Sequence, residues 1–139
     1  MKRLLPVLLL LLLTVSASAQ NLRWGVRAGI TDGEPMIGGE FLMPIGAGFV
    51  LNPNLEFSSE LFSANADVHY DFDINPTTQF WVGAGLAFVN PDEGDYDGGF
   101  NLLAGAGTRR GRWYPYVQGK LTSAGDIDDY GSIAIGVRF

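Results

Sequence analysis

His69 is the only histidine of this 139-residue chain, and Asp71 follows it two positions later. A histidine near a carboxylate can serve as a general base or as a metal ligand. A catalytic triad would also need a serine spaced to meet the imidazole, whereas Tyr70 and Asp71 are the residues that follow His69. We therefore expect His69 to belong to a polar network inside the protein, and we expect no enzymatic activity.

The second group with potential chemistry is the acidic segment NPDEGDYDGG, residues 90–99. Its carboxylates could offer oxygen ligands to Ca²⁺; they are Asp92, Glu93, Asp95 and Asp97. The segment lacks the full spacing of a calcium-binding loop and its distal bidentate glutamate. We expect a solvated acidic loop with no defined metal site and no cofactor; diffuse attraction of divalent cations that also bridge lipopolysaccharide phosphates stays open as an alternative.

Polar and apolar residues alternate with a period of two along much of the rest of the chain, and this period predicts strands. Eight segments of this kind span 21–30, 36–43, 49–58, 62–72, 79–89, 99–108, 113–122 and 130–139. One face of these segments carries four positive and four negative side chains: Arg23, Arg27, Lys120, Arg138, Glu40, Glu56, Asp67 and Asp71. Charges of opposite sign in equal number fit a closed interior, because unpaired buried charges are expensive.

The opposite face of every segment carries no charge; in the last segment it reads Gly131, Ile133, Ile135, Val137 and Phe139. A polar interior with an apolar exterior is typical of transmembrane β-barrels and inverts the pattern of soluble barrels. The sequence predicts a closed eight-stranded antiparallel up-and-down transmembrane β-barrel. Such a barrel is only wide enough for its own side chains, and the expected plug consists of Leu42, Trp81, Leu103, Tyr114, Tyr116 and Tyr130.

The first nineteen residues differ from the rest. Lys2 and Arg3 precede the apolar run LLPVLLLLLLTV, and Ala17 and Ala19 are placed for cleavage, which predicts a signal peptide over 1–19 and a barrel domain over 20–139. Removal of the two basic residues changes the formal net charge from −6 to −8. A nucleic acid is therefore not an expected partner. Charged residues make up 17% of the chain, below the usual share of about 25%.

An even number of strands places both termini on one side, which the signal peptide and bacterial precedent make the periplasm. The expected periplasmic turns are 44–48, 73–78 and 109–112, and the expected external loops are 31–35, 59–61, 90–98 and 123–129. The external loops carry acidic residues and no basic ones, whereas the periplasmic turn RRGR carries Arg109, Arg110 and Arg112.

Four stretches carry a resemblance to a known family: LNPNLEF (51–57), FWVGAGLAF (80–88), YPYVQGK (114–120) and IAIGVRF (133–139). The chain resembles the small OmpA/OmpX-like outer membrane β-barrel proteins of Gram-negative bacteria over essentially all of residues 20–139. The resemblance implies that the outer membrane assembly machinery reads the last strand, through Ser132, Ala134, Val137 and Phe139. Ala134 departs from the glycine that is usual at its position.

Some barrels of this kind are lipid A deacylases with a Ser/His/acid set. In the expected orientation His69 lies in the periplasmic half, whereas lipid A occupies the outer leaflet, so the geometry does not suit that reaction. We expect a monomeric integral outer membrane barrel with a structural or surface-interaction role, in contact with the bilayer and lipopolysaccharide. Two alternatives stay open: a narrow pore for ions or very small solutes, and a soluble periplasmic calycin-like ligand carrier.

Overall fold

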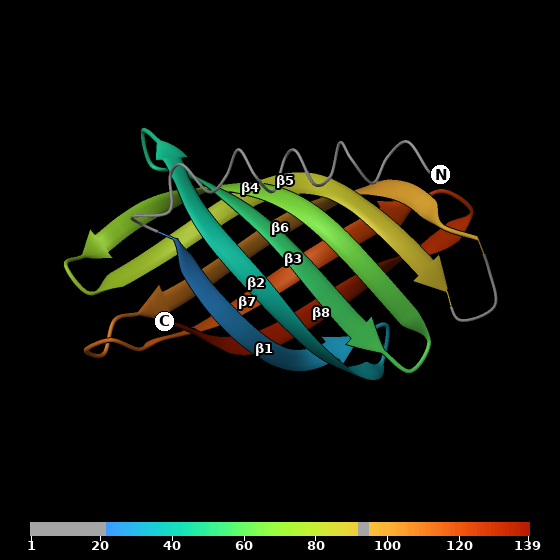
Figure 1. Ribbon diagram of the computed structural model, residues 1–139, viewed down its shortest axis with the longest axis horizontal. Helices are drawn as coiled ribbons and strands as arrows, with labels where there is room; N and C mark the ends of the chain where they lie inside the picture. The colour runs from blue at the N-terminus through green and yellow to red at the C-terminus, as the bar shows by residue number, and fades with distance from the viewer. Residues whose placement is uncertain (1–21, 92–94) are drawn as a thin grey trace.

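The computed structural model describes residues 22–91 and 95–139. In it, the segments with alternating polar and apolar side chains form antiparallel strands that pair with one another. Within these residues, eight strands pair in chain order, and β1 pairs with β8 to close the barrel (Figure 1). The strands are β1 (Arg23–Thr31), β2 (Glu34–Gly46), β3 (Phe49–Ser58), β4 (Leu61–Asn75), β5 (Thr78–Pro91), β6 (Asp97–Thr108), β7 (Tyr114–Ala124) and β8 (Ile127–Arg138). The predicted closed antiparallel barrel is confirmed. The expected signal peptide, residues 1–19, lies outside the described residues.

Most strands are longer than expected and most connections are shorter; β3 has the expected bounds, and β1 runs one residue further at its end but starts two residues later. The connection expected at 31–35 is only the pair Asp32 and Gly33, whose φ angles of 48° and 83° suit a tight hairpin turn between right-twisted strands. The long loop expected at 123–129 is likewise reduced to Gly125 and Asp126. Turn-type residues near the strand ends join the ladder because water solvates their side chains while the backbone stays paired. At the start of β7 the prediction was too long: Trp113 precedes the strand and forms an isolated bridge with Arg110.

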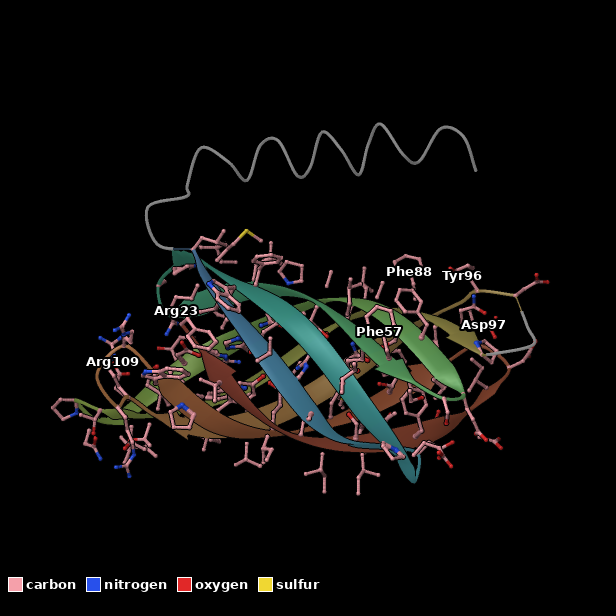
Figure 2. The ribbon with its side chains drawn as sticks, turned by 60° about the horizontal axis from the view of Figure 1, so that its bottom comes forward. Arg23, Phe57, Phe88, Tyr96, Asp97 and Arg109 are labelled. Carbon is pink, nitrogen blue, oxygen red and sulfur yellow. The ribbon has the colours of Figure 1, made fainter. Side chains whose placement is uncertain are left out.

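The two ends of the barrel differ in charge. The arginine end holds the start of β1, the end of β8 and the turn with Arg109, Arg110 and Arg112. The opposite end, called the acidic end, holds Asp97 and the hairpin connections between β1 and β2, β3 and β4, and β7 and β8, which carry acidic residues. Figure 2 shows Arg23 and Arg109 at one end of the barrel and Asp97 at the other.

The outer surface is apolar. Large apolar side chains face outward from every described strand, among them Trp24, Ile37, Leu55, Phe72, Val82, Leu102, Val117 and Ile135. Aromatic rings contact one another near the arginine end, as in the stacked pair of Phe72 and Phe80. Phe57 and Phe88 project from the outer surface nearer the acidic end (Figure 2). Two aromatic zones flanking an apolar band are typical of barrels that cross a bilayer. Among the described residues no helix is long and apolar enough to cross a membrane.

The interior contains two buried apolar clusters and many buried polar side chains. Trp81, Leu103, Tyr114 and Tyr116 form a buried cluster in the half nearer the arginine end. A second cluster at the acidic end combines Ala87, Val89, Ala124 and Tyr130, with Leu61 and Ile127 packed against it. Polar and charged side chains occupy the space between the clusters. The predicted plug residues Leu42, Trp81, Leu103, Tyr114, Tyr116 and Tyr130 are all buried.

Candidate functional site

Glu40 of β2 is the centre of the buried charge network. Its Oε1 accepts a hydrogen bond from Arg138 Nε at 2.8 Å, and its Oε2 accepts one from Asn52 Nδ2 at 2.7 Å. Arg27 Nη1 lies 3.9 Å from the same carboxylate. The closure of β1 onto β8 makes this possible, because Gly25 pairs with both Glu40 and Arg138. Residues 98 positions apart in the chain thus form one ion pair.

Glu56 of β3 forms the second anionic centre. Lys120 Nζ lies 2.8 Å from its Oε2, and Arg27 Nη2 lies 3.2 Å from its Oε1. Arg27 therefore bridges the two glutamates. Among the described residues its guanidinium nitrogens make no hydrogen bond, so the attraction is mainly Coulombic and benefits from the low dielectric constant of the interior.

Asp67 of β4 is buried without an ion pair among the described residues, and amides satisfy it instead. Asn54 Nδ2 and Asn101 Nδ2 each donate to it at 2.8 Å. Asn101 also accepts a hydrogen bond from Thr122 Oγ1 at 2.8 Å. Hydrogen bonds from two other strands, β3 and β6, thus hold the third buried carboxylate in place, as a buried anion requires.

Arg138 is held by aromatic rings as well as by Glu40. Its guanidinium carbon lies 4.4 Å from the ring centroid of Trp81 and 4.3 Å from that of Tyr116. Desolvated cation–π contacts of this kind contribute about 2 kcal/mol or more. Trp81 is itself fixed by a hydrogen bond of 3.0 Å from its Nε1 to Gln118 Oε1. Inside the barrel the Arg138 cation is thus already paired with a carboxylate and with aromatic rings.

Two of the predicted interior charges lie apart from this network. Arg23 is half-buried at the arginine end, with its guanidinium carbon 5.8 Å from the ring centroid of Tyr114. Asp71 lies on the interior side of β4 and contacts His69. The remaining six residues are buried inside the barrel: Arg27, Glu40, Glu56, Asp67, Lys120 and Arg138.

His69 is almost completely buried, and its Nδ1 lies 2.9 Å from Asp71 Oδ1. Trp81 packs beside the imidazole with ring centroids 5.8 Å apart. Within the described ranges no group forms a hydrogen bond with the second ring nitrogen, Nε2. The histidine and the carboxylate thus form a pair, but no serine of the described segments donates to or accepts from the imidazole, and a hydrolytic triad requires that contact.

The acidic segment is only partly described. Asp92 and Glu93 lie outside the described residues, so the structure does not place the full set. Asp95 is exposed and Asp97 begins β6, half-exposed at the acidic end. Within the described ranges, no group of three or more His, Cys, Asp or Glu side chains is arranged to hold a metal ion.

The C-terminal residues divide between the two faces of β8. Ser132 and Ala134 point into the barrel and are buried, whereas Val137 and Phe139 lie on the outer face and are half-buried. Phe139 stacks on Trp24 with ring centroids 4.4 Å apart and meets Trp113 edge-on at 4.9 Å. Its backbone N–H donates to Trp24 O at 2.9 Å. The terminal aromatic residue is therefore anchored on its neighbours.

Sequence reasoning missed the part that inward glycines play. A Cβ on Gly105 would lie 2.5 Å from the Trp81 ring, and a Cβ on Gly136 would lie 2.5 Å from the Tyr116 ring. The missing side chains make room for the aromatic rings that hold Arg138. The sequence does contain a signal for this role, because glycines occur on the same polar face of the strands as the inward aromatic residues. Only the pairing of strands shows which ring each glycine accommodates.

No protein-family model matches the sequence, and no curated protein matches it. Solved structures do share its architecture. The N-terminal β-barrel domain of Pseudomonas aeruginosa OprF superposes with a TM-score of 0.70 at 13% identity, covering 85% of this chain and 96% of that one. Neisserial surface protein A gives 0.63 at 15% identity, with 84% and 94% covered. The outer membrane enzyme PagL gives 0.59 at 11% identity, with 84% and 98% covered. At these identities the likeness concerns the fold: this chain has the closed antiparallel barrel that these outer membrane proteins share.

Proposed function

We propose that the protein is an integral outer membrane β-barrel of the small OmpA/OmpX-like kind, with a structural or surface-interaction role. The observation that carries the proposal is the inversion of the two faces. Ile37, Leu121 and Ile135 are each about two-thirds exposed on the outside, whereas Arg27, Glu40 and Lys120 are buried inside. A bilayer stabilises that arrangement and water does not.

The filled interior supports a structural role over transport. Apolar clusters lie toward both ends of the barrel, and the charges between them are paired with one another or with amides. Ions crossing the barrel would have to displace these buried contacts. The alternative of a narrow pore therefore finds less support than a plugged barrel, although both share the membrane location.

The soluble carrier alternative conflicts with the outer surface. A calycin-like carrier would bury its apolar face around a ligand and expose its charges. Here the apolar side chains cover the exterior, and the cavity such a carrier needs is filled by Trp81, Glu40 and Asn101, each almost fully buried.

Catalysis is not part of the proposal, although PagL, with a similar fold, is an enzyme by name. His69 is buried deep in the barrel and has only Asp71 as a polar partner among the described residues. A hydrolase would need the imidazole to reach both a nucleophile and a substrate.

The apolar band and the acidic end of the barrel indicate which molecules would surround it in the cell. Acyl chains would cover the apolar band, and divalent cations would link the acidic end to lipopolysaccharide phosphates on the outer leaflet. The assembly machinery of the outer membrane would recognise β8 through Ser132, Ala134, Val137 and Phe139. The barrel would act as a monomer, since closure leaves no strand edge for pairing with a second copy.

The decisive experiment combines cell fractionation with a gel of unboiled and boiled samples. We expect the protein in the detergent-extracted outer membrane fraction, and we expect the unboiled form to migrate faster because a closed barrel resists unfolding by the gel detergent. Recovery from the soluble periplasm without detergent would contradict the membrane assignment and favour the carrier.

A further inference from the structure

Two adjoining hollows mark the outer face formed by β6, β7, β8 and β1. One has a volume of about 900 Å³ and the other about 820 Å³, and Ala28 and Ile135 line both. They therefore form one apolar groove, which runs along the barrel wall toward the arginine end.

Small outward side chains create this groove. Strand pairing places Ala104, Gly119 and Ile133 in one row across β6, β7 and β8. Ala106, Val117 and Ile135 form the next row toward the arginine end. Ala104 and Ala106, at the β6 side of each row, project little from the barrel, whereas Ile133 and Ile135 of β8 project further and border the groove on that side. A flexible hydrocarbon chain fills such a hollow through dispersion contacts with its walls.

The groove ends beneath the basic turn. Thr108 lines its end, and Arg109 follows directly, with its backbone N–H donating to Thr77 O at 2.7 Å. Arg109, Arg110 and Arg112 are exposed. Across residues 22–91 and 95–139, no carboxylate lies within ion-pair distance of these three side chains. Free guanidinium groups are well suited to phosphate oxygens.

Aromatic rings fix the level of the membrane boundary at this point. Trp24 and Trp113 pack against Phe139, next to Val26 and Val137 of the groove. Tryptophan is enriched at the depth of the lipid headgroups. The turn that carries the arginines follows the groove residue Thr108 and includes Trp113, so it lies near the depth expected for lipid phosphates, at the end of an apolar groove for the chains.

We propose that this groove and the turn with Arg109, Arg110 and Arg112 together bind one phospholipid with an anionic phosphodiester headgroup. The proposal rests on the membrane function argued above and adds a defined lipid site to it. The charge asymmetry of the barrel supports an anionic headgroup, because the opposite end is acidic and would repel it.

The test is native mass spectrometry of the refolded protein in neutral detergent, with added phosphatidylglycerol, phosphatidylcholine or glycerol 3-phosphate. We expect one phosphatidylglycerol to bind at least about fivefold more tightly than phosphatidylcholine, since each basic side chain near an anionic lipid contributes roughly that factor. Glycerol 3-phosphate, which has no acyl chains, should not bind. Equal binding of the two lipids would overturn the proposal, and binding of glycerol 3-phosphate would show an anion site without a lipid groove.

Variants separate the two halves of the site. The triple variant Arg109→Gln, Arg110→Gln and Arg112→Gln should reduce phosphatidylglycerol binding to the level of phosphatidylcholine, whereas the matching triple lysine variant should keep most of the preference. Gly119→Leu should fill the groove and reduce retention of the lipid; a Cβ at this position has open space around it, so the barrel should still fold. Ala66→Leu, which places the same side chain on the outer face of β4, is the matched control and should retain the lipid.

Two further controls test the effect of net charge and the folding of each variant. Asp128→Asn with Asp129→Asn changes the net charge at the far end and should leave lipid binding unchanged; a changed preference would mean that net charge, not the turn, selects the lipid. Each sample is first run unboiled and boiled on a gel. A protein without a heat-modifiable band in detergent would contradict the proposed membrane function, whereas a folded barrel without lipid preference would contradict only the lipid site.

Discussion

At the scale of single residues, each buried charged side chain of the interior has a partner: an opposite charge, an amide or an aromatic ring. Arg27 contacts two glutamates, and Arg138 contacts Glu40 and three aromatic rings. A buried ion pair adds little net stability compared with apolar residues, but removal of one partner is costly because the other charge stays buried alone. The network therefore makes specific predictions for neutralising substitutions.

Glu40→Gln removes the carboxylate that faces both Arg138 and Arg27. We expect the free energy of unfolding to fall by about 3–5 kcal/mol, the typical loss when a buried pair is broken. Urea titration of the refolded protein, followed by the loss of the fast-migrating band, measures this. Glu60→Gln at an exposed connection is the control and should change stability by less than about 0.5 kcal/mol. Equal effects of the two substitutions would show that the network is not electrostatically important.

Gly105→Ala tests the fit of the interior rings. The added Cβ would lie 2.5 Å from the Trp81 ring, so the indole must shift and disturb both its bond to Gln118 and its contact with Arg138. We expect a destabilisation of about 1–3 kcal/mol, as for other overpacked cores. Gly131→Ala faces outward, with its nearest contact 3.6 Å away at Leu121. That variant should unfold at the same urea concentration as the original protein, and a similar loss in both would argue against the packing explanation.

At the scale of elements, β8 has the most distinct features. It closes the barrel against β1 and pairs with β7 on its other side. Its last side chain, Phe139, packs between Trp24 of β1 and Trp113 before β7. The aromatic contacts therefore lie across the two seams at which the terminal strand joins the barrel.

Phe139→Ala should lower stability in vitro by about 1–3 kcal/mol, because two ring pairs are lost at about 0.5–1.5 kcal/mol each. Burial from water contributes little here, since the ring faces lipid in the proposed setting. Phe100→Ala, an exposed outward position, is the control and should have a smaller effect. In cells, the proposed recognition of β8 predicts that Phe139→Ala lowers the amount in the outer membrane far more than Phe100→Ala does. Equal amounts of the two variants would contradict that role.

At the scale of the whole molecule, the filled interior predicts an electrically silent barrel. Trp81 and Val89, from the two interior apolar clusters, are each fully buried. We expect no discrete conductance steps when the refolded protein is inserted into a planar bilayer. Steps whose ion selectivity reverses in Lys120→Glu would support the pore alternative instead, because Lys120 lies between the two clusters.

The sequence alone determined the architecture of the barrel. Side-chain direction alternates strictly along a strand, so the charge-free face of each segment was visible locally, and closure follows because lipid tolerates no open edge. The inward position of Arg27, Glu56 and Lys120 needed no knowledge of their neighbours.

Only the tertiary structure decided which interior residues meet. Glu40 and Arg138 come together because β1 pairs with both β2 and β8 at Gly25, and that register depends on the stagger of the closed barrel and not on any local pattern. The same holds for Gly105 beneath Trp81 and for the groove at whose end Arg109 lies. Strand ends also escaped prediction, because the ladder continues into water through residues such as Glu34 and Asp128 whose types suggest loops. Local alternation sets the direction of each side chain, whereas long-range pairing sets its partner.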